Sequence, residues 1–130
     1  MIHIKGLNNF ELAVINKLLD GDHPILNNLR LQASEALLVK REYTGVGFYC
    51  HFKVSSNEHT LREDIHNIGG VNAEIEGLNH GAGFILFITH GQLDLLECYT
   101  YDEPWPKEIG KFTLSYNKEP RDFSNDIELR

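Results

Sequence analysis

The chain has 130 residues, of which 42% are apolar and 24% are charged, as in a globular domain that buries its own core. No apolar run approaches the roughly 18 residues of a membrane-spanning helix, and the N-terminus lacks the features of a signal peptide. The formal net charge is −7, and Val54 to Pro106 holds nine acidic residues against one basic residue, Arg62. Such a charge repels nucleic acid phosphates. A cytoplasmic domain that binds neither nucleic acid nor membranes is therefore expected.

The two cysteines lie in separate apolar runs. Cys50 and Cys98 lack Cys-x-x-Cys spacing. A reduced core cysteine behaves as a small hydrophobic residue. We therefore expect two buried, reduced thiols, with a disulfide between them as the alternative.

A first helix is expected between Asn8 and Gly21. Asn8 is a suitable N-cap and Glu11 occupies the third helical position, an Asn variant of the capping box. One apolar stripe then recurs at helical spacing: Phe10, Val14 and Leu18, widened by Ile15 and Leu19. Because the stripe is one-sided, this helix is expected to pack on another layer.

A second helix is expected to follow at once. Asp22 or His23 is a suitable cap, Pro24 suits the first turn, and the helix is expected to fade between Ser34 and Ala36. Beyond that point the apolar period changes from that of a helix to that of strands.

The clearest strand is Val46 to Val54, where side-chain character alternates over nine residues. Thr44-Gly45 separates it from the run Leu37 to Tyr43, which is a hairpin signal. Further strands are expected at Val71 to Glu76, Phe84 to Ile88, Leu93 to Thr100 and Phe112 to Tyr116. Residues 55–70 are polar and aperiodic, so a loop is expected there, and the polar tail from about residue 117 is expected to fray.

These elements predict one domain over residues 1–130, of the α+β class. Two N-terminal helices are expected to pack on one face of a five- or six-stranded antiparallel meander. Because Phe84 to Ile88 is apolar on both faces, it is expected to be a central strand. The residues expected to be nearly fully buried are Val14, Phe48, Phe52, Phe84 and Leu86.

Seven histidines are many for this length, yet none are paired as H-x-x-x-H or H-x-H. We therefore expect no stoichiometric transition metal and no cofactor. The nucleophile elbow, the P-loop and the dinucleotide fingerprint are absent as well, so nothing in the sequence requires an enzyme.

An acid–base cleft remains as an alternative. If the strand at Val46 to Val54 neighbours the one at Val71 to Glu76, a His and two carboxylates share one surface. The cleft residues would then be His51, Glu74, Glu76, His80 and Glu97. A Glu-x-Glu pattern is also usual on any solvated sheet face. Glu97 is expected to be partly buried, where it needs hydrogen-bond donors, and to tie down the segment that follows it.

An aromatic–acidic cluster follows the strand at Leu93 to Thr100. Its members are Tyr99, Tyr101, Asp102, Glu103 and Trp105, the last held between two prolines. Rigid aromatic anchors ringed by polar residues are typical of protein–protein interfaces. Trp105 as a lid over one end of the core is an equally good interpretation.

Three motifs carry a family resemblance: Thr44-Gly45-Val46-Gly47-Phe48, then Ala73-Glu74-Ile75-Glu76-Gly77-Leu78-Asn79-His80-Gly81-Ala82-Gly83-Phe84, and Leu95-Leu96-Glu97-Cys98-Tyr99-Thr100-Tyr101-Asp102-Glu103-Pro104-Trp105-Pro106. They resemble a family of small uncharacterised bacterial proteins with the signatures G-x-G-F, E-I-E-G-L-x-H-G-A-G-F and L-E-x-Y-T-Y-x-x-x-W-P. This resemblance implies kinship and supplies no reaction. The chain also resembles, more loosely, the small acidic immunity proteins that neutralise bacterial toxins, on size, acidity and its helix-plus-sheet build.

Two functional hypotheses follow. The first is a non-enzymatic acidic binding protein whose aromatic cluster meets a basic protein partner, such as a bacterial toxin that it neutralises. The second is a small-molecule-binding or hydrolytic domain that uses the His/Glu cleft. The oligomeric state stays open.

Overall fold

The structure is a computed structural model that describes residues 2–129. Its helices are α1 (Asn9–Leu18), α2 (Pro24–Ser34) and the short α3 (Phe123–Asp126). Its strands are β1 (Ala36–Tyr43), β2 (Gly47–Val54), β3 (Ile65–Ile75), β4 (Ala82–Thr89), β5 (Gln92–Thr100), β6 (Phe112–Tyr116) and β7 (Ile127–Leu129). None of the described helices is long and apolar enough to cross a membrane.

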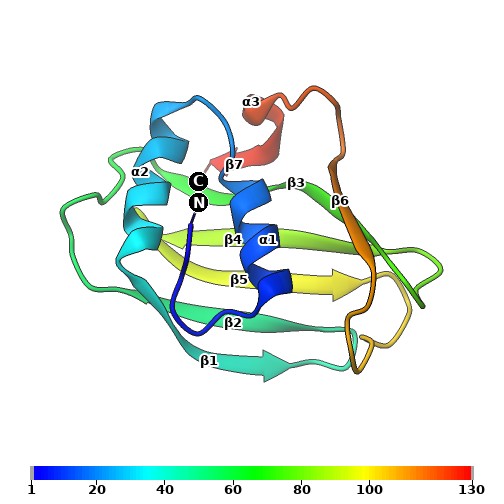
Figure 1. The fold of residues 1–130 in the computed structure, drawn as a ribbon. Helices are drawn as coiled ribbons and strands as arrows, with labels where there is room; N and C mark the ends of the chain where they lie inside the picture. The colour runs from blue at the N-terminus through cyan, green and yellow to red at the C-terminus, as the bar shows by residue number, and fades with distance from the viewer. Residues whose placement is uncertain (1, 130) are drawn as a thin grey trace.

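The strands form one antiparallel sheet in the order β1-β2-β5-β4-β3-β6, with β7 paired to the start of β3. Helices α1 and α2 both lie on one face of this sheet (Figure 1). The predicted fold class, α+β with two N-terminal helices on one face of an antiparallel sheet, is confirmed. The opposite side, away from α1 and α2, is called the outer face below.

The strand order departs from a consecutive meander at two places, the β2–β5 pairing and the pairing of β6 with β3 instead of β5. Strand β2 pairs with β5 and not with β3, so β5 and β4 lie between β2 and β3. The backbones of β2 and β5 approach closely at Gly47, where an added Cβ would lie 1.9 Å from the carbonyl oxygen of Cys98. A glycine is therefore required where the β1–β2 hairpin joins the rest of the sheet.

Local signals at the N-terminus act as the sequence predicts. The Asn8 side chain accepts from the backbone of Glu11, and the Glu11 carboxylate accepts from the backbone of Asn8, which completes the capping box. His23 caps α2 through its Nδ1 atom, and Pro24 opens the helix. The apolar stripe of α1 is buried against the sheet.

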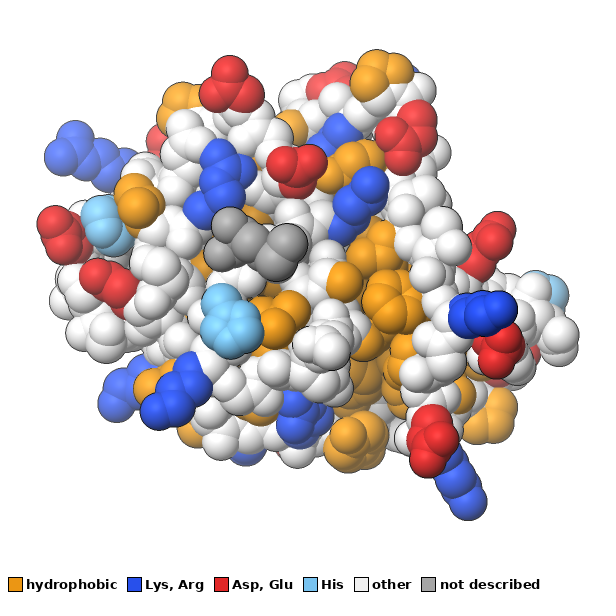
Figure 2. Space-filling view, in the orientation of Figure 1, with side chains coloured by type: hydrophobic (Ala, Val, Ile, Leu, Met, Phe, Trp, Pro, Cys, Tyr) orange, Lys and Arg blue, Asp and Glu red, His pale blue; other side chains and the backbone are white. Residues whose placement is uncertain are grey.

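The core lies between the two helices and the sheet. All five residues expected there, Val14, Phe48, Phe52, Phe84 and Leu86, are buried. Cys50 and Cys98 are also buried and both are free thiols, as expected. On the helix side, hydrophobic side chains remain visible in a hollow between α1 and β6 (Figure 2).

The expected loop at residues 55–70 is shorter in the structure. Residues 65–70 belong to β3, which continues without a break to Ile75. The prediction fails here because a bulge between Ile68 and Val71 interrupts the alternation. Gly69 and Gly70 together lie opposite one residue of β4, Ile85, and Gly70 has the positive φ that glycine tolerates best.

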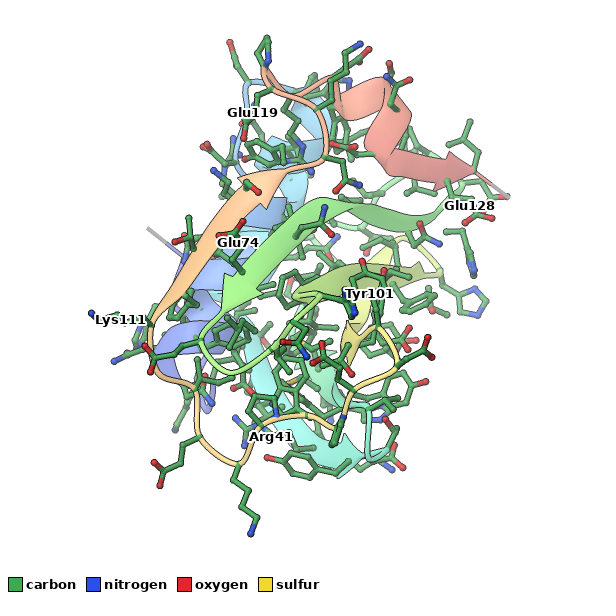
Figure 3. The ribbon with its side chains drawn as sticks, turned by 90° about the vertical axis from the view of Figure 1, so that its right-hand side faces the viewer. Arg41, Glu74, Tyr101, Lys111, Glu119 and Glu128 are labelled. Carbon is green, nitrogen blue, oxygen red and sulfur yellow. The ribbon has the colours of Figure 1, made fainter. Side chains whose placement is uncertain are left out.

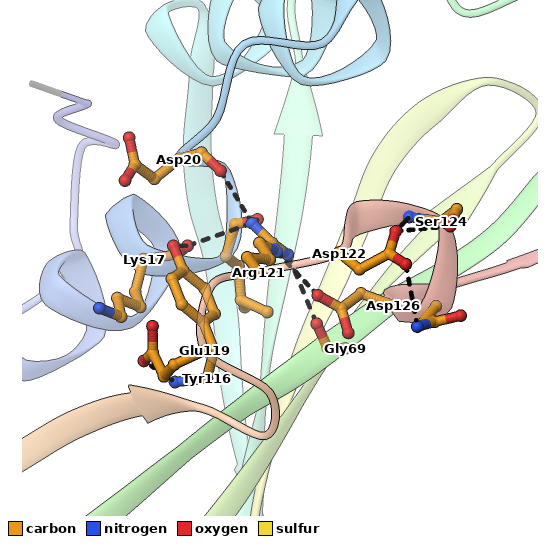
Figure 4. A network of polar contacts seen from close by, with 11 residues as sticks. Lys17, Asp20, Gly69, Tyr116, Glu119, Arg121, Asp122, Ser124 and Asp126 are labelled. Atoms are coloured by element: carbon orange, nitrogen blue, oxygen red, sulfur yellow. Dashed lines mark hydrogen bonds and ion pairs between the residues drawn. The ribbon is translucent and has the colours of Figure 1, made fainter.

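The expectation that the tail frays is also wrong. Residues 123–129 form α3 and β7, and β7 pairs with β3. Arg121 holds the segment, since its guanidinium donates to the carbonyl oxygens of Leu18 and Asp20 at the end of α1 (Figure 4). It also pairs with Asp126 at 2.8 Å. These contacts join residues about a hundred positions apart, so local polarity did not reveal them.

Candidate functional site

The expected aromatic–acidic cluster is divided between the two sides of the sheet. Tyr99 and Tyr101 lie on the outer face, and Tyr101 appears away from the helices in Figure 3. Trp105 lies on the helix side, against Phe10 of α1 and Phe48 of β2. Asp102 adopts a left-handed conformation with φ of 59°, which turns the chain just after β5. The expectation of one continuous patch is therefore corrected.

Tyr99 and Tyr101 form a compact pair, here called the tyrosine pair. Their rings meet edge to face with centroids 5.6 Å apart. Both hydroxyls lie over Gly83 of β4, where an added Cβ would be 2.6 Å from Tyr99 Oη and 2.7 Å from Tyr101 Oη. The Tyr101 hydroxyl donates to Asn72 of β3 at 3.3 Å. The pair thus fills the space that a glycine leaves on the outer face.

Burial and charge act on the tyrosines of this face. Burial, followed by the neighbouring Tyr101, raises the pKa of Tyr99 to about 12. Tyr49 of β2 lies opposite Glu97 of β5, and the Glu97 carboxylate is the chief cause of its raised pKa. Glu97 is half-buried, as the sequence predicted. At ordinary pH these tyrosines therefore stay neutral hydrogen-bond donors beside an acid.

The middle of the outer face is apolar. Along β4, Ile85 and Phe87 alternate with buried residues, so their side chains lie on the outer face. They pair with Glu97 and Leu95 of β5. These side chains are half-buried, and neither α1 nor α2 covers them. The outer face therefore combines a tyrosine pair, an apolar centre and acidic side chains.

Glu103 acts locally. Its carboxylate accepts from the backbone N–H groups of Asn79 and His80, at 2.9 and 3.0 Å, and so clamps the turn between β3 and β4. These two hydrogen bonds lower the pKa of Glu103. Asp102, in contrast, is exposed. Of the two acids in the expected cluster, Asp102 is the one free to meet a partner.

Trp105 forms one wall of an aromatic pocket of about 460 Å³. Its ring meets Phe48 edge to face at 5.1 Å and Phe10 at 6.0 Å, and its backbone N–H donates to Gly45 at 2.9 Å. Phe10 of α1 and Phe112 of β6 both line the pocket, so it lies between these two elements, where Figure 2 shows the hollow. Trp105 is thus a lid over one end of the core, which the sequence analysis gave as the alternative to a partner contact.

One residue that lines this pocket, Glu11, forms an ion pair with the half-buried Arg41. Glu11 is 1% exposed, and the Arg41 guanidinium donates to both of its carboxylate oxygens, at 2.7 and 2.5 Å. The Cys50 thiol donates to the same carboxylate at 3.4 Å. Burial, and then Glu11, raises the pKa of Cys50 to about 12, so this thiol is unreactive. The pair was not predicted, because Glu11 was already explained as a helix cap.

The expected His/Glu cleft is not assembled. Glu74, Glu76 and His80 line an open groove of about 660 Å³ at the β3–β4 turn. His51 lies on β2, which β5 and β4 separate from β3, and its Nε2 contacts Glu42 at 2.5 Å; Glu97 lies on β5. The condition for the cleft was that β2 neighbours β3, and the strand order excludes it.

For a metal ion, the described residues offer one group of three side chains with converging ligand atoms: Glu35, Glu58 and His59. None of them was singled out by the sequence analysis. They come from two segments more than twenty positions apart, so no spacing motif connects them.

Comparison with protein-family models, with curated proteins and with solved structures found no match.

Proposed function

We propose that this protein is a non-enzymatic binding protein that receives a basic protein partner on its outer face. The observation that carries the proposal is the tyrosine pair, held rigidly over Gly83 beside acidic side chains and an uncovered apolar centre. Tyrosines of this kind supply large contact area at little cost in conformational entropy. The proposed contact does not include Trp105, which packs against the core, or Glu103, whose carboxylate binds the turn between β3 and β4.

The charge of the chain supports a basic partner. Exposed Glu74 and half-buried Glu97 lie on the outer face, and Asp102 is exposed beside the tyrosine pair. They belong to the stretch with nine acidic residues and one basic residue. Complementary charge accelerates association, and its effect falls as salt shortens the Debye length to about 8 Å at physiological ionic strength. A basic bacterial toxin domain, which this protein would neutralise, is the partner that fits this chemistry.

The test measures binding kinetics with the partner retained from a native lysate. Glu74→Lys is expected to slow association several-fold, and Tyr101→Ala is expected to accelerate dissociation. Gly83→Ala displaces the tyrosine pair without changing charge, so it is expected to act like Tyr101→Ala.

Glu108→Lys is the matched control, since it makes the same charge change in an exposed residue beside the aromatic pocket on the helix side. All four variants must keep the melting temperature of the wild type. If Glu108→Lys slows association as much as Glu74→Lys, or if neither tyrosine change alters dissociation, the outer face is not the interface.

A second candidate function is binding of a small aromatic molecule in the pocket beneath Trp105. The observation in its favour is an aromatic pocket of about 460 Å³, lined in part by the buried Glu11 carboxylate and within the usual size of ligand sites. Trp105 is the only tryptophan of the chain, so its fluorescence reports on the pocket directly. Titration with phenol is expected to change this fluorescence saturably, and Phe112→Ala is expected to weaken the response. A linear, non-saturating response would contradict the candidate.

A further inference from the structure

Glu35, Glu58 and His59 meet at the end of the sheet opposite the tyrosine pair. Glu35 lies between α2 and β1, whereas Glu58 and His59 lie in the loop that leads from β2 to β3. One ligand atom of each side chain lies within 4.8 Å of the other two. The Glu58 carboxylate and the His59 Nε2 atom are 4.0 Å apart. A divalent ion between them would reach all three after small side-chain rotations.

An independent observation concerns the Glu35 carboxylate. Its Oε2 atom is shielded from solvent and has no hydrogen-bond partner within residues 2–129. A buried carboxylate oxygen normally accepts at least one hydrogen bond, because losing water without a replacement is unfavourable. No other side-chain nitrogen or oxygen in the described part of the chain is left in this condition. A bound cation would supply a partner for this oxygen.

The backbone around the three side chains is held in place. Gln32 is fully buried, and its amide donates to the carbonyl oxygens of His59 and Gly91 at 2.8 and 2.9 Å, while its Oε1 accepts from Leu93. The carbonyl oxygen of Glu35 accepts from the backbone of Ser55 at 3.3 Å. Both segments that carry the ligands are therefore fixed before any ion arrives, which is the condition for a preorganised site.

A second glutamine supports the loop from its other side. The Gln92 amide donates to the carbonyl oxygen of Ser56 at 3.1 Å and to the Asn57 side chain at 2.9 Å. The Ser56 hydroxyl in turn accepts from the backbone N–H of Glu58. The loop conformation that brings Glu58 and His59 toward Glu35 is thus specified by hydrogen bonds on both sides.

We propose that Glu35, Glu58 and His59 bind one zinc ion. Two carboxylates and one imidazole are a ligand set that Zn²⁺ accepts, and three protein ligands leave one position for water or for a further ligand. Because no histidines or cysteines are paired along the chain, the sequence predicts no metal. A spacing motif cannot indicate a site whose ligands come from two segments that are distant in the sequence. The site is separate from the outer-face interface and does not depend on it.

The test is calorimetric titration of the metal-free protein with zinc chloride. One ion per chain is expected. Glu35→Gln and His59→Gln are each expected to weaken binding at least about tenfold, since even outer-shell changes at metal sites cost that much. The control variants are Glu63→Gln, an exposed acid of the same loop, and His80→Gln, an exposed histidine at the β3–β4 turn. Both are expected to bind zinc as the wild type does.

Thermal unfolding supplies a second measurement that does not depend on calorimetry. Zinc is expected to raise the melting temperature of the wild type and of both controls, and to leave Glu35→Gln unchanged. Without zinc, Glu35→Gln is expected to melt no lower than the wild type, because it replaces a half-buried carboxylate whose Oε2 atom has no hydrogen-bond partner in the described part of the chain. Absence of binding, or weak binding shared equally by all variants, would overturn the proposal, as would loss of binding in the two controls.

Discussion

At the scale of single residues, Tyr99 and Cys50 make stability depend on alkaline pH. Burial raises the pKa of Tyr99 from 10.0 to about 12, and burial together with Glu11 raises that of Cys50 from 9.0 to about 12. At a pH between the ordinary pKa of each group and its raised pKa in the folded state, the folded state holds protons that the unfolded state has released. The unfolding free energy therefore falls as pH rises from about 9 to about 12, and this contribution is fully present below that window.

Urea unfolding at pH 8, 10 and 11.5 checks this dependence. A steady decrease in the unfolding free energy is expected for the wild type. Tyr99→Phe removes one of the groups whose pKa is raised in the folded state, so the decrease between pH 10 and pH 11.5 is expected to be smaller for this variant. An identical decrease in both proteins would mean that Tyr99 ionises as freely in the folded state as in the unfolded state.

Phe84 is a second residue whose contribution is measurable. It is 2% exposed, lies on the central strand β4 and contacts Phe10 of α1 with ring centroids 5.9 Å apart. Phe84→Ala is expected to lower the unfolding free energy by about 3–5 kcal/mol, the range for deleting a core aromatic side chain. Phe87→Ala is the control, because Phe87 lies on the same strand but is half-buried on the outer face, and a smaller loss is expected. Equal losses would mean that the outer face is packed as tightly as the core.

At the scale of elements, Arg121 connects the end of α1 to the C-terminal segment. Arg121 and Asp126 are 8% and 13% exposed at their side chains, and the same guanidinium stacks on Tyr116 at 4.9 Å. Arg121→Ala leaves Asp126 without its partner in a poorly hydrated place. We expect a loss of about 3–5 kcal/mol in unfolding free energy, as for other broken buried ion pairs.

Limited proteolysis distinguishes this local role from a general loss of stability. In Arg121→Ala, cleavage after residue 117 is expected to precede cleavage elsewhere, because α3 and β7 lose their attachment. Lys118→Ala, at an exposed residue of the same segment, is expected to leave the pattern unchanged. Simultaneous cleavage throughout Arg121→Ala would argue against a separately anchored segment.

At the scale of the whole molecule, the β2–β5 pairing joins the β1–β2 hairpin to the other strands. The pairing depends on Gly47, where a methyl group would overlap the backbone of Cys98. Gly47→Ala is expected to cost more than about 3 kcal/mol, because backbone atoms on both sides must separate. Gly69→Ala is the control, since its nearest neighbour would be 3.7 Å away and the loss is expected to stay below about 1 kcal/mol. Similar losses at both positions would mean that the sheet yields at this junction.

Much of the fold could be predicted because its signals are local. The capping box at Asn8 involves residues three positions apart, and the alternation in β2 requires only neighbouring residues. The prediction failed where two glycines interrupt the period of β3, and where Arg121 attaches a polar tail to α1. In each of these cases the stabilising contact is remote in the chain, and the local pattern is that of a loop.

The candidate sites depended on tertiary structure to a greater extent. Alternation in β2 predicts which side chains share a face, but it is the same whichever strand lies alongside, so it did not reveal that β5 is the neighbour. That choice separated His51 from Glu74, and the turn at Asp102 separated Trp105 from Tyr101.

The sequence by itself determined the two N-terminal helices, most strands, five of the buried residues and the acidic charge, because short-range periodicity and composition encode them. Only the tertiary structure decided that the tyrosine pair fills the space over Gly83 and that Glu35 meets His59. Both arrangements follow from how distant segments close on one another, which no spacing along the chain expresses.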